Sequence, residues 1–236
     1  MSMGAVTMAP PSHSATRLVR IPAYGASIAA ELTIPDDARG LVVFSRIGGG
    51  RRRTLRDRRE AVTIKDGGYG TLVFDLLTPD EEMADGDTRL LHFDVHFLAK
   101  RLLDVVDWVA DQDAAADLPL TLFGADTGAA AALIVAAMRA RVVQAVVSSA
   151  GRPDLASLAL ERVQAPTLLI VGSRDTDAIP RNRCALERLT APKGFVLLQG
   201  QTHSLEDNDS VDEVARLALG WFDRHVTHWR SEGWMS

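Results

Sequence analysis

Five consecutive residues carry the strongest chemical signal in this chain. They read Gly124-Ala125-Asp126-Thr127-Gly128 and lie between an apolar run at 118–123 and an alanine-rich run at 129–140. A strand, a Gly-x-nucleophile-x-Gly turn and a helix, in this order, form a sharp bend that exposes the central side chain. Serine or cysteine usually occupies that centre. The carboxylate of Asp126 therefore changes the reaction that the turn can support.

Two further polar residues follow predicted strands in the same way. Asp175 comes shortly after the apolar run 167–171, and His203 comes shortly after the run 195–198. Open parallel sheets bind ligands at the carboxyl ends of their strands, so these side chains are expected to converge with Asp126. Nucleophile, acid and histidine follow one another in the chain order of a triad built on such a sheet. The pattern predicts an Asp-His-Asp triad.

Apolar runs that alternate with helical patterns must position these residues. The predicted strands are 18–23, 27–33, 41–45, 71–75, 118–123, 142–148, 167–171 and 195–198, and the predicted helices are 55–65, 93–111, 129–140, 181–189 and 211–226. The first two strands read as a hairpin, and 76–90 reads as a long loop. Short buried strands separated by helices predict an α/β fold with a doubly wound, mostly parallel sheet.

Composition narrows the classes of protein. A chain of 236 residues with 47% hydrophobic content can build one large core, and its net charge of −5 argues against a general nucleic-acid binder. The only cysteine, Cys184, allows no intrachain disulfide, and no apolar run approaches the roughly 20 residues that span a bilayer. We therefore predict a cytoplasmic protein with a flexible leader at 1–14, one domain at 15–228 and a tail at 229–236. Neither nucleic acid nor membrane is an expected partner.

These motifs resemble the dienelactone hydrolase-like branch of the α/β-hydrolases, whose small bacterial members occur alone or fused to a phosphoribosyltransferase domain. The resemblance covers residues 17–226. It is carried by Asp75-Leu76-Leu77-Thr78-Pro79, Leu122-Phe123-Gly124-Ala125, Ala165-Pro166-Thr167-Leu168-Leu169-Ile170-Val171-Gly172, Arg174-Asp175-Thr176 and Thr202-His203. It implies an α/β-hydrolase fold without a cap domain, with Asp175 as the triad acid and His203 as the triad base. No metal or organic cofactor is implied.

Two positions depart from the pattern of that family. Asp126 stands where the family has its nucleophile, and Arg46-Ile47-Gly48-Gly49 stands where the family usually has His-Gly-x-Gly. Backbone N–H groups build the oxyanion hole of this fold, so Ile47 and Thr127 remain the expected donors. The chain thus keeps the helper residues of the triad and alters both the attacking residue and the oxyanion loop.

Three roles are open to Asp126. A carboxylate can attack saturated carbon and form an ester that His203, held by Asp175, would hydrolyse with water. Attack on an ester carbonyl is less favourable because it gives a mixed anhydride. Asp126 can also act as a general acid or base, or as the charge partner of Arg46, which would lower the pKa of the aspartate. The plainest interpretation is that Asp126 only caps the helix that follows it.

The remaining charged clusters have plain interpretations beside functional ones. His92 and His96 have the spacing of a metal pair, but no third ligand accompanies them, so a polar helix face is the preferred interpretation. The arginines at 51–53, 56, 58 and 59 form the densest run of charge. Such a run is usually a solvated surface, although one beside a pocket would steer an anionic substrate.

The sequence therefore predicts an enzyme that acts on a small organic, preferably anionic, substrate. Asp126 is its nucleophile or acid/base residue, His203 its base, Asp175 the orienter, and Arg46 a substrate-binding residue. The alternative is a non-hydrolytic or catalytically silent homologue: a binding protein, or an isomerase or cyclase that reuses the pocket. The expected partners are the small-molecule substrate and a second copy of the chain in a homodimer.

Overall fold

One mixed sheet of eight strands forms the centre of the molecule. The computed structural model describes residues 15–47, 50–202, 205 and 208–226. The strands are β1 (Arg17–Ala23), β2 (Ala26–Thr33), β3 (Leu41–Arg46), β4 (Gly70–Asp75), β5 (Leu120–Asp126), β6 (Val143–Gly151), β7 (Thr167–Gly172) and β8 (Lys193–Leu198). Their spatial order is β1-β2-β4-β3-β5-β6-β7-β8.

The connections confirm the predicted hairpin and the doubly wound fold. β1 and β2 pair antiparallel around a turn in which Gly25 has a φ of 78°, a conformation that glycine adopts without steric cost. β2 pairs antiparallel with β4, whereas every pair from β4 through β3, β5, β6 and β7 to β8 is parallel. The carboxyl ends of six strands therefore meet at one edge of the sheet.

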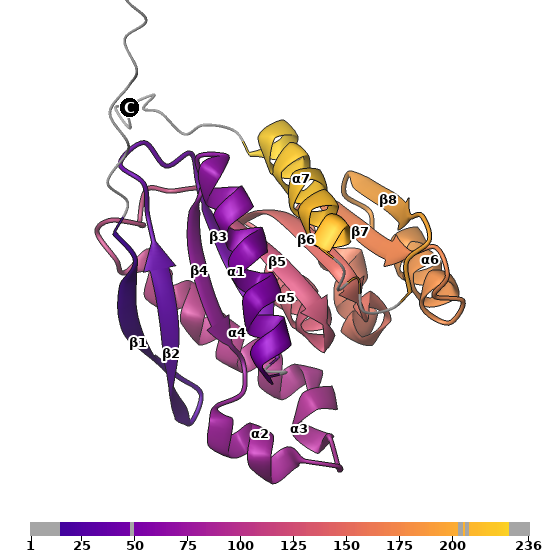
Figure 1. Cartoon of the computed structure of the whole chain (residues 1–236), viewed down its shortest axis with the longest axis horizontal. Coiled ribbons are helices and arrows are strands. Elements are labelled where there is room, and N and C mark those ends of the chain that lie inside the picture. The colour runs from indigo at the N-terminus through magenta and orange to yellow at the C-terminus, as the bar shows by residue number, and fades with distance from the viewer. Residues whose placement is uncertain (1–14, 48–49, 203–204, 206–207, 227–236) are drawn as a thin grey trace, which may run out of the picture.

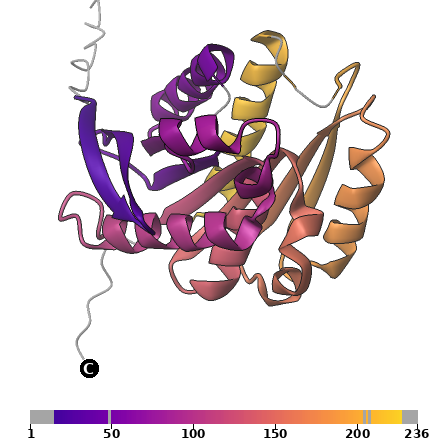
Figure 2. The same ribbon diagram turned by 90° about the horizontal axis from the view of Figure 1, so that it is seen from below.

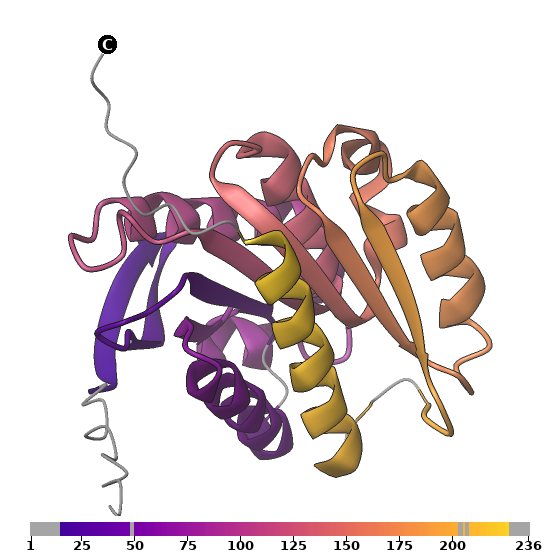
Figure 3. The same cartoon turned by 90° about the horizontal axis from the view of Figure 1, so that it is seen from above.

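Helices cover both faces of the sheet (Figures 1 and 3). The helical elements are α1 (Gly50–Asp66), α2 (Pro79–Asp85), α3 (Leu90–Phe93), α4 (Val95–Ala110), α5 (Thr127–Met138), the 3-10 helix η1 (Pro153–Arg162), α6 (Ala178–Arg188) and α7 (Asn208–His225). α1 and α7 pack together on one face, while α4, α5, η1 and α6 form the layer on the other. The predicted α/β fold with a doubly wound, mostly parallel sheet is confirmed.

The core lies between the sheet and these two layers. Every residue of β3 and β7 is buried, and the residues of α5 from Thr127 to Ala136 are all buried. Small side chains let this helix lie close to the sheet, as its alanine content indicates. On the other face, Phe44 and Phe123 stack with their ring centroids 5.1 Å apart. The strand that leads to Asp126 is therefore fixed from both sides.

The segment predicted as one long loop, 76–90, contains α2, and α3 begins at its last residue, so that prediction was wrong. Thr78 begins α2 with a capping box, in which its side chain accepts from the backbone N–H of Glu81 and Glu81 accepts from the backbone N–H of Thr78. This reciprocal pair satisfies two amides that a helix start leaves without partners. We call residues 79–93, with α2 and α3, the α2–α3 arm. The arm lies at the lower edge of the sheet in Figure 1 and in front of the sheet in Figure 2, which shows the molecule from below.

Other differences are shifts of element boundaries. α1 begins at Gly50 rather than near residue 55, so the arginines at 51–53 belong to a helix and not to a loop. η1 was not predicted; it fills the short stretch between β6 and β7. The predicted leader 1–14 and tail 229–236 lie outside the described residues. In the part of the chain that the structure describes, no helix combines the length and apolar character needed to cross a membrane.

Candidate active site

Asp126 occupies the sharp turn between β5 and α5. Its backbone has a φ of 50° and a ψ of −133°, a conformation that L residues rarely adopt and that costs on the order of 1–3 kcal/mol. The side chain makes no capping hydrogen bond to α5, so the interpretation of Asp126 as a simple helix cap was wrong. The strained turn places a carboxylate where the fold normally presents its nucleophile.

The two glycines that flank Asp126 are required by close packing. A Cβ atom on Gly124 would lie 2.5 Å from the Cα of Ala129, and one on Gly128 would lie 2.3 Å from the carbonyl oxygen of Ser45. Both neighbours are backbone atoms, which cannot move aside as a flexible side chain can. The Ser45 hydroxyl also donates to the Gly128 carbonyl at 2.9 Å. β3, β5 and α5 therefore meet as tightly as the elbow pattern demands.

A histidine and an arginine lie at the carboxylate of Asp126, and a second arginine bonds its backbone. The Nε2 atom of His92 lies 2.9 Å from Oδ2 of Asp126, and Nη2 of Arg89 lies 3.8 Å from the same oxygen. The backbone N–H of Arg152 donates to the carbonyl of Asp126 at 3.0 Å. The pKa of the Arg152 guanidinium is raised, mainly by its hydrogen bonds to Asp154 and in smaller part by the charge of Asp126. The site thus places positive charge beside its acid.

The α2–α3 arm holds His92 against the elbow. Its backbone N–H donates to the buried carboxylate of Asp85 at 3.0 Å, and its carbonyl accepts from the Thr127 hydroxyl at 2.7 Å. Burial raises the pKa of Asp85, but hydrogen bonds from the Leu91 and His92 amides and the nearby His92 ring outweigh it, so the pKa is lowered. Asp85 therefore stays ionised and keeps its hold on the segment before α4.

Sequence reasoning missed the role of His92. His92 lies in α3 and is 6% exposed, whereas His96 lies in α4 and is exposed. The expectation of a shared polar helix face is therefore wrong. The i, i+4 spacing did single out His92, but only as half of a metal pair. Among residues 15–47, 50–202, 205 and 208–226, no three metal-ligating side chains gather.

The other predicted site residues are placed as follows. Asp175 follows β7, is partly buried, and accepts a hydrogen bond from the backbone N–H of Ala178 at 2.9 Å through Oδ1. Thr127 begins α5 beside Asp126, and Ile47 follows β3 with its side chain in the core. His203 lies outside the described residues. The predicted triad and oxyanion donors therefore stay predictions.

Arg46 lies at the end of β3 and is buried. Its guanidinium pairs with Glu60 of α1 and lies 5.1 Å from the ring centroid of Phe123. Arg56 also pairs with Glu60, at 3.2 Å, and donates to the Ser149 hydroxyl at 3.2 Å. The buried Arg46 and the mostly buried Arg56 thus share the carboxylate of Glu60. The substrate-binding role of Arg46 stays a prediction.

The exposed part of the arginine run is engaged in ion pairs. Arg58 pairs with Glu31 at 2.8 Å, and Arg59 forms a two-bond fork with Asp212 of α7. These contacts tie α1 to β2 and to α7. They give this part of the run a structural role.

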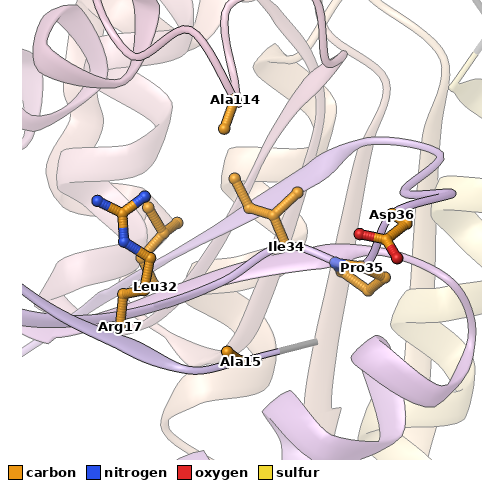
Figure 4. A pocket seen from close by; sticks show the side chains of 7 residues that line it. All are labelled: Ala15, Arg17, Leu32, Ile34, Pro35, Asp36 and Ala114. Atoms are coloured by element: carbon orange, nitrogen blue, oxygen red, sulfur yellow. The ribbon is translucent and has the colours of Figure 1, made fainter. Parts of the chain in front are cut away.

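A pocket of about 280 Å³ lies elsewhere, between the β1–β2 ribbon and the loop that carries Ala114 (Figure 4). Its lining includes Leu32 and Ile34 at the end of β2. Because Thr33 pairs with Thr71 near the start of β4, the pocket lies at the sheet edge opposite Asp126. It is therefore separate from the candidate active site.

Known structures place the chain in a family. The crystal structure of dienelactone hydrolase from Anabaena variabilis is 40% identical in sequence, with a TM-score of 0.85 over 91% of this chain and 99% of that one. The chain belongs to the dienelactone hydrolase family. No family model matches the sequence. A dienelactone hydrolase-like promiscuous phosphotriesterase from metagenomic libraries is 17% identical with a TM-score of 0.72, over 90% of this chain and 99% of that one, and supports the fold alone.

Two curated proteins of Mycobacterium tuberculosis, each named "putative phosphoribosyl transferase", are 43% identical over 208 residues. The match covers 88% of this chain but 46% of each relative. This member of the dienelactone hydrolase family therefore spans about half the length of the curated relatives it matches. This partial coverage is consistent with the predicted resemblance to proteins in which a dienelactone hydrolase-like domain is fused to a phosphoribosyltransferase domain.

Proposed function

We propose that the chain hydrolyses small organic molecules by attack of the Asp126 carboxylate. The observation that carries the proposal is the strained backbone of Asp126, with its φ of 50° and ψ of −133°, at the elbow of a dienelactone hydrolase fold. Such strain persists only where the surrounding structure enforces it, and it concentrates at functional sites. A carboxylate in that place attacks a saturated carbon and forms an ester with the enzyme.

The second half of the reaction uses the predicted triad. Asp175 orients His203, which activates water against the carbonyl carbon of the Asp126 ester. The amides of Ile47 and Thr127 donate to the oxyanion that forms there. This sequence of steps suits epoxides and alkyl halides, because attack on a carboxylic ester would give an unstable anhydride.

The charges around the elbow favour an anionic substrate. Arg89 lies beside Asp126 with its side chain 49% exposed, so it can contact a ligand. Arg152 adds further positive charge near Asp126. Arginine binds carboxylates with paired, charge-assisted hydrogen bonds. A small epoxide or alkyl halide that bears a carboxylate is the expected substrate class.

Isotope labelling tests the proposal directly. Wild-type protein is incubated with bromohexanoate in water labelled with heavy oxygen, and the mass of the peptide that contains Asp126 is then measured by mass spectrometry. Attack by Asp126 predicts that heavy oxygen enters this carboxylate, because water cleaves the ester at its acyl carbon. The variant D126N should lose turnover and gain no label. Turnover without label in the wild type would show that Asp126 is not the nucleophile.

A catalytically silent homologue is the second candidate. The contact of Asp126 with His92 and its approach to Arg89 favour it, because these groups compensate the carboxylate without any substrate. The variant D126S separates the two candidates when it is tested on activated esters and small lactones. Hydrolysis by D126S, together with no turnover of any substrate by the wild type, would favour the silent homologue. Labelling of Asp126 during turnover would exclude it.

A further inference from the structure

His92 is a buried imidazole whose Nε2 atom meets the carboxylate proposed to attack. The N–O distance is 2.9 Å, and the side chain of His92 is 8% exposed. Its backbone is held on both sides, by Asp85 through the N–H and by Thr127 through the carbonyl. A ring so anchored keeps one nitrogen at the reacting carboxylate. Neither the elbow motif nor the triad accounts for this residue.

The single nitrogen Nε2 has two competing partners. It lies 2.9 Å from Oδ2 of Asp126 and 2.5 Å from Nη2 of Arg89. A protonated Nε2 donates to Asp126, whereas an unprotonated Nε2 accepts from Arg89; one ring nitrogen cannot do both at once. Arg89 is half-exposed, so a substrate carboxylate can draw its guanidinium away. With Arg89 drawn away by the substrate, a protonated Nε2 of His92 would have Asp126 as its remaining partner of the two and would donate to it.

We propose that His92 is the acid that protonates the leaving oxygen when Asp126 opens an epoxide, and that it recovers this proton from Asp126. The inference rests on the proposed function, since it assumes that Asp126 attacks carbon. It narrows the substrate class to molecules whose leaving group is an oxygen that needs a proton.

The steps balance in atoms and electrons. An oxygen of Asp126 forms a bond to an epoxide carbon, the ring C–O bond breaks with its electron pair on oxygen, and that oxygen takes the proton of His92. Water then adds to the acyl carbon of the ester, and one of its protons passes through the triad base to the departing alkoxide. Collapse of the intermediate leaves Asp126 as a carboxylic acid with the second water proton. That proton returns to Nε2 of His92 across the 2.9 Å contact, and the net reaction is epoxide plus water to diol.

The two tyrosines of the chain have other contacts. Tyr24 packs its ring edge-on against Phe97, with ring centroids 5.8 Å apart, in the turn between β1 and β2. Tyr69 is buried and donates its hydroxyl to Asp223 at 3.1 Å, and burial, together with the charge of Asp223, raises its pKa. A phenol that resists ionisation and already donates to a carboxylate is a poor acid for a reaction at Asp126. Among these three side chains, the geometry favours His92.

A matched pair of substrates tests the role of His92. Epoxyhexanoate leaves an alkoxide that needs a proton, whereas bromohexanoate leaves bromide, which needs none. H92N should lower kcat/KM for the epoxide by about 10²- to 10⁴-fold, the usual contribution of a general acid. The same variant should change kcat/KM for the bromide by less than about tenfold. The control H96N alters an exposed histidine on α4 and should leave both values near those of the wild type.

The outcomes separate this inference from the proposed function. Equal losses on both substrates would show that His92 is only structural, and an unchanged epoxide rate would show that it is not the acid; both results overturn the inference. Labelling of Asp126 during bromide turnover, with no hydrolysis of the epoxide, would also overturn it while the proposed function stands. Turnover that leaves Asp126 unlabelled would overturn both proposals.

Discussion

Replacing Arg101 with methionine tests how the α2–α3 arm is held over the candidate active site. Arg101 lies on α4 with its side chain 1% exposed. Its Nη1 donates to the Leu76 carbonyl at 2.7 Å and to Glu81 at 2.6 Å, and its Nη2 donates to the Tyr24 carbonyl at 2.9 Å and to Glu81 at 2.8 Å. One guanidinium therefore joins α4 to α2 and to the first hairpin.

The expected loss of stability depends on which hydrogen-bond partners of Arg101 can bond to water once the guanidinium is removed. Methionine keeps an apolar stem but removes every donor. Breaking a buried ion pair costs about 3–5 kcal/mol. Glu81 is 26% exposed and regains solvent, whereas the carbonyl of the fully buried Leu76 loses its donor, at about 1–3 kcal/mol. We expect R101M to lower the free energy of unfolding by about 3 kcal/mol, which is a fall in Tm of about 6–12 °C for a domain of this size.

Urea unfolding followed by circular dichroism measures this change, with R139M as the matched control. Arg139 also makes a two-bond fork, from Nε and Nη2 to Asp107 at 2.9 and 2.7 Å, but these side chains are 34% and 49% exposed. An exposed pair contributes about 0–1 kcal/mol. If R101M costs no more than R139M, the argument from burial is refuted.

Three further outcomes are expected. The pKa of Glu81 is lowered, chiefly by its hydrogen bonds with Arg101. Because the folded state therefore binds fewer protons than the unfolded state, this stabilisation is full above the unfolded carboxyl pKa of about 4 and is lost as pH falls through the lowered folded pKa. The urea midpoint should therefore decline from neutral to acid pH, and it should decline less in R101M. G128A should cost about 1–3 kcal/mol or more, because its Cβ would meet the Ser45 carbonyl, whereas G220A, where no atom lies within 4 Å, should be neutral or stabilising in the same assay. R89M should raise KM for bromohexanoate by about tenfold or more and leave KM for the neutral bromohexane unchanged. Equal changes in KM for both substrates would show that Arg89 does not bind the substrate carboxylate.

Much of the fold could be predicted because its signals are local. Short apolar runs predicted all six parallel strands near their observed positions, and the glycines around Asp126 indicated the elbow. Glu81, by contrast, belongs to a capping box that was overlooked, so α2 was interpreted as loop. The early start of α1 was missed for another reason: the arginines and glycines before residue 55 show no apolar periodicity.

The candidate site was less accessible to sequence reasoning because its key contact crosses 34 residues. Asp126 is marked by its motif, but His92 reaches it only after the α2–α3 arm has folded back, with Asp85 and Thr127 holding the histidine backbone. No hydrophobic periodicity or residue spacing in the sequence predicts that the α2–α3 arm folds back to bring His92 to Asp126. The i, i+4 relation of His92 and His96 even pointed to the wrong chemistry, because the two residues belong to different helices. An acid in place of the usual nucleophile is therefore best interpreted through the side chains that the fold brings to it, and here these are an imidazole and a half-exposed guanidinium.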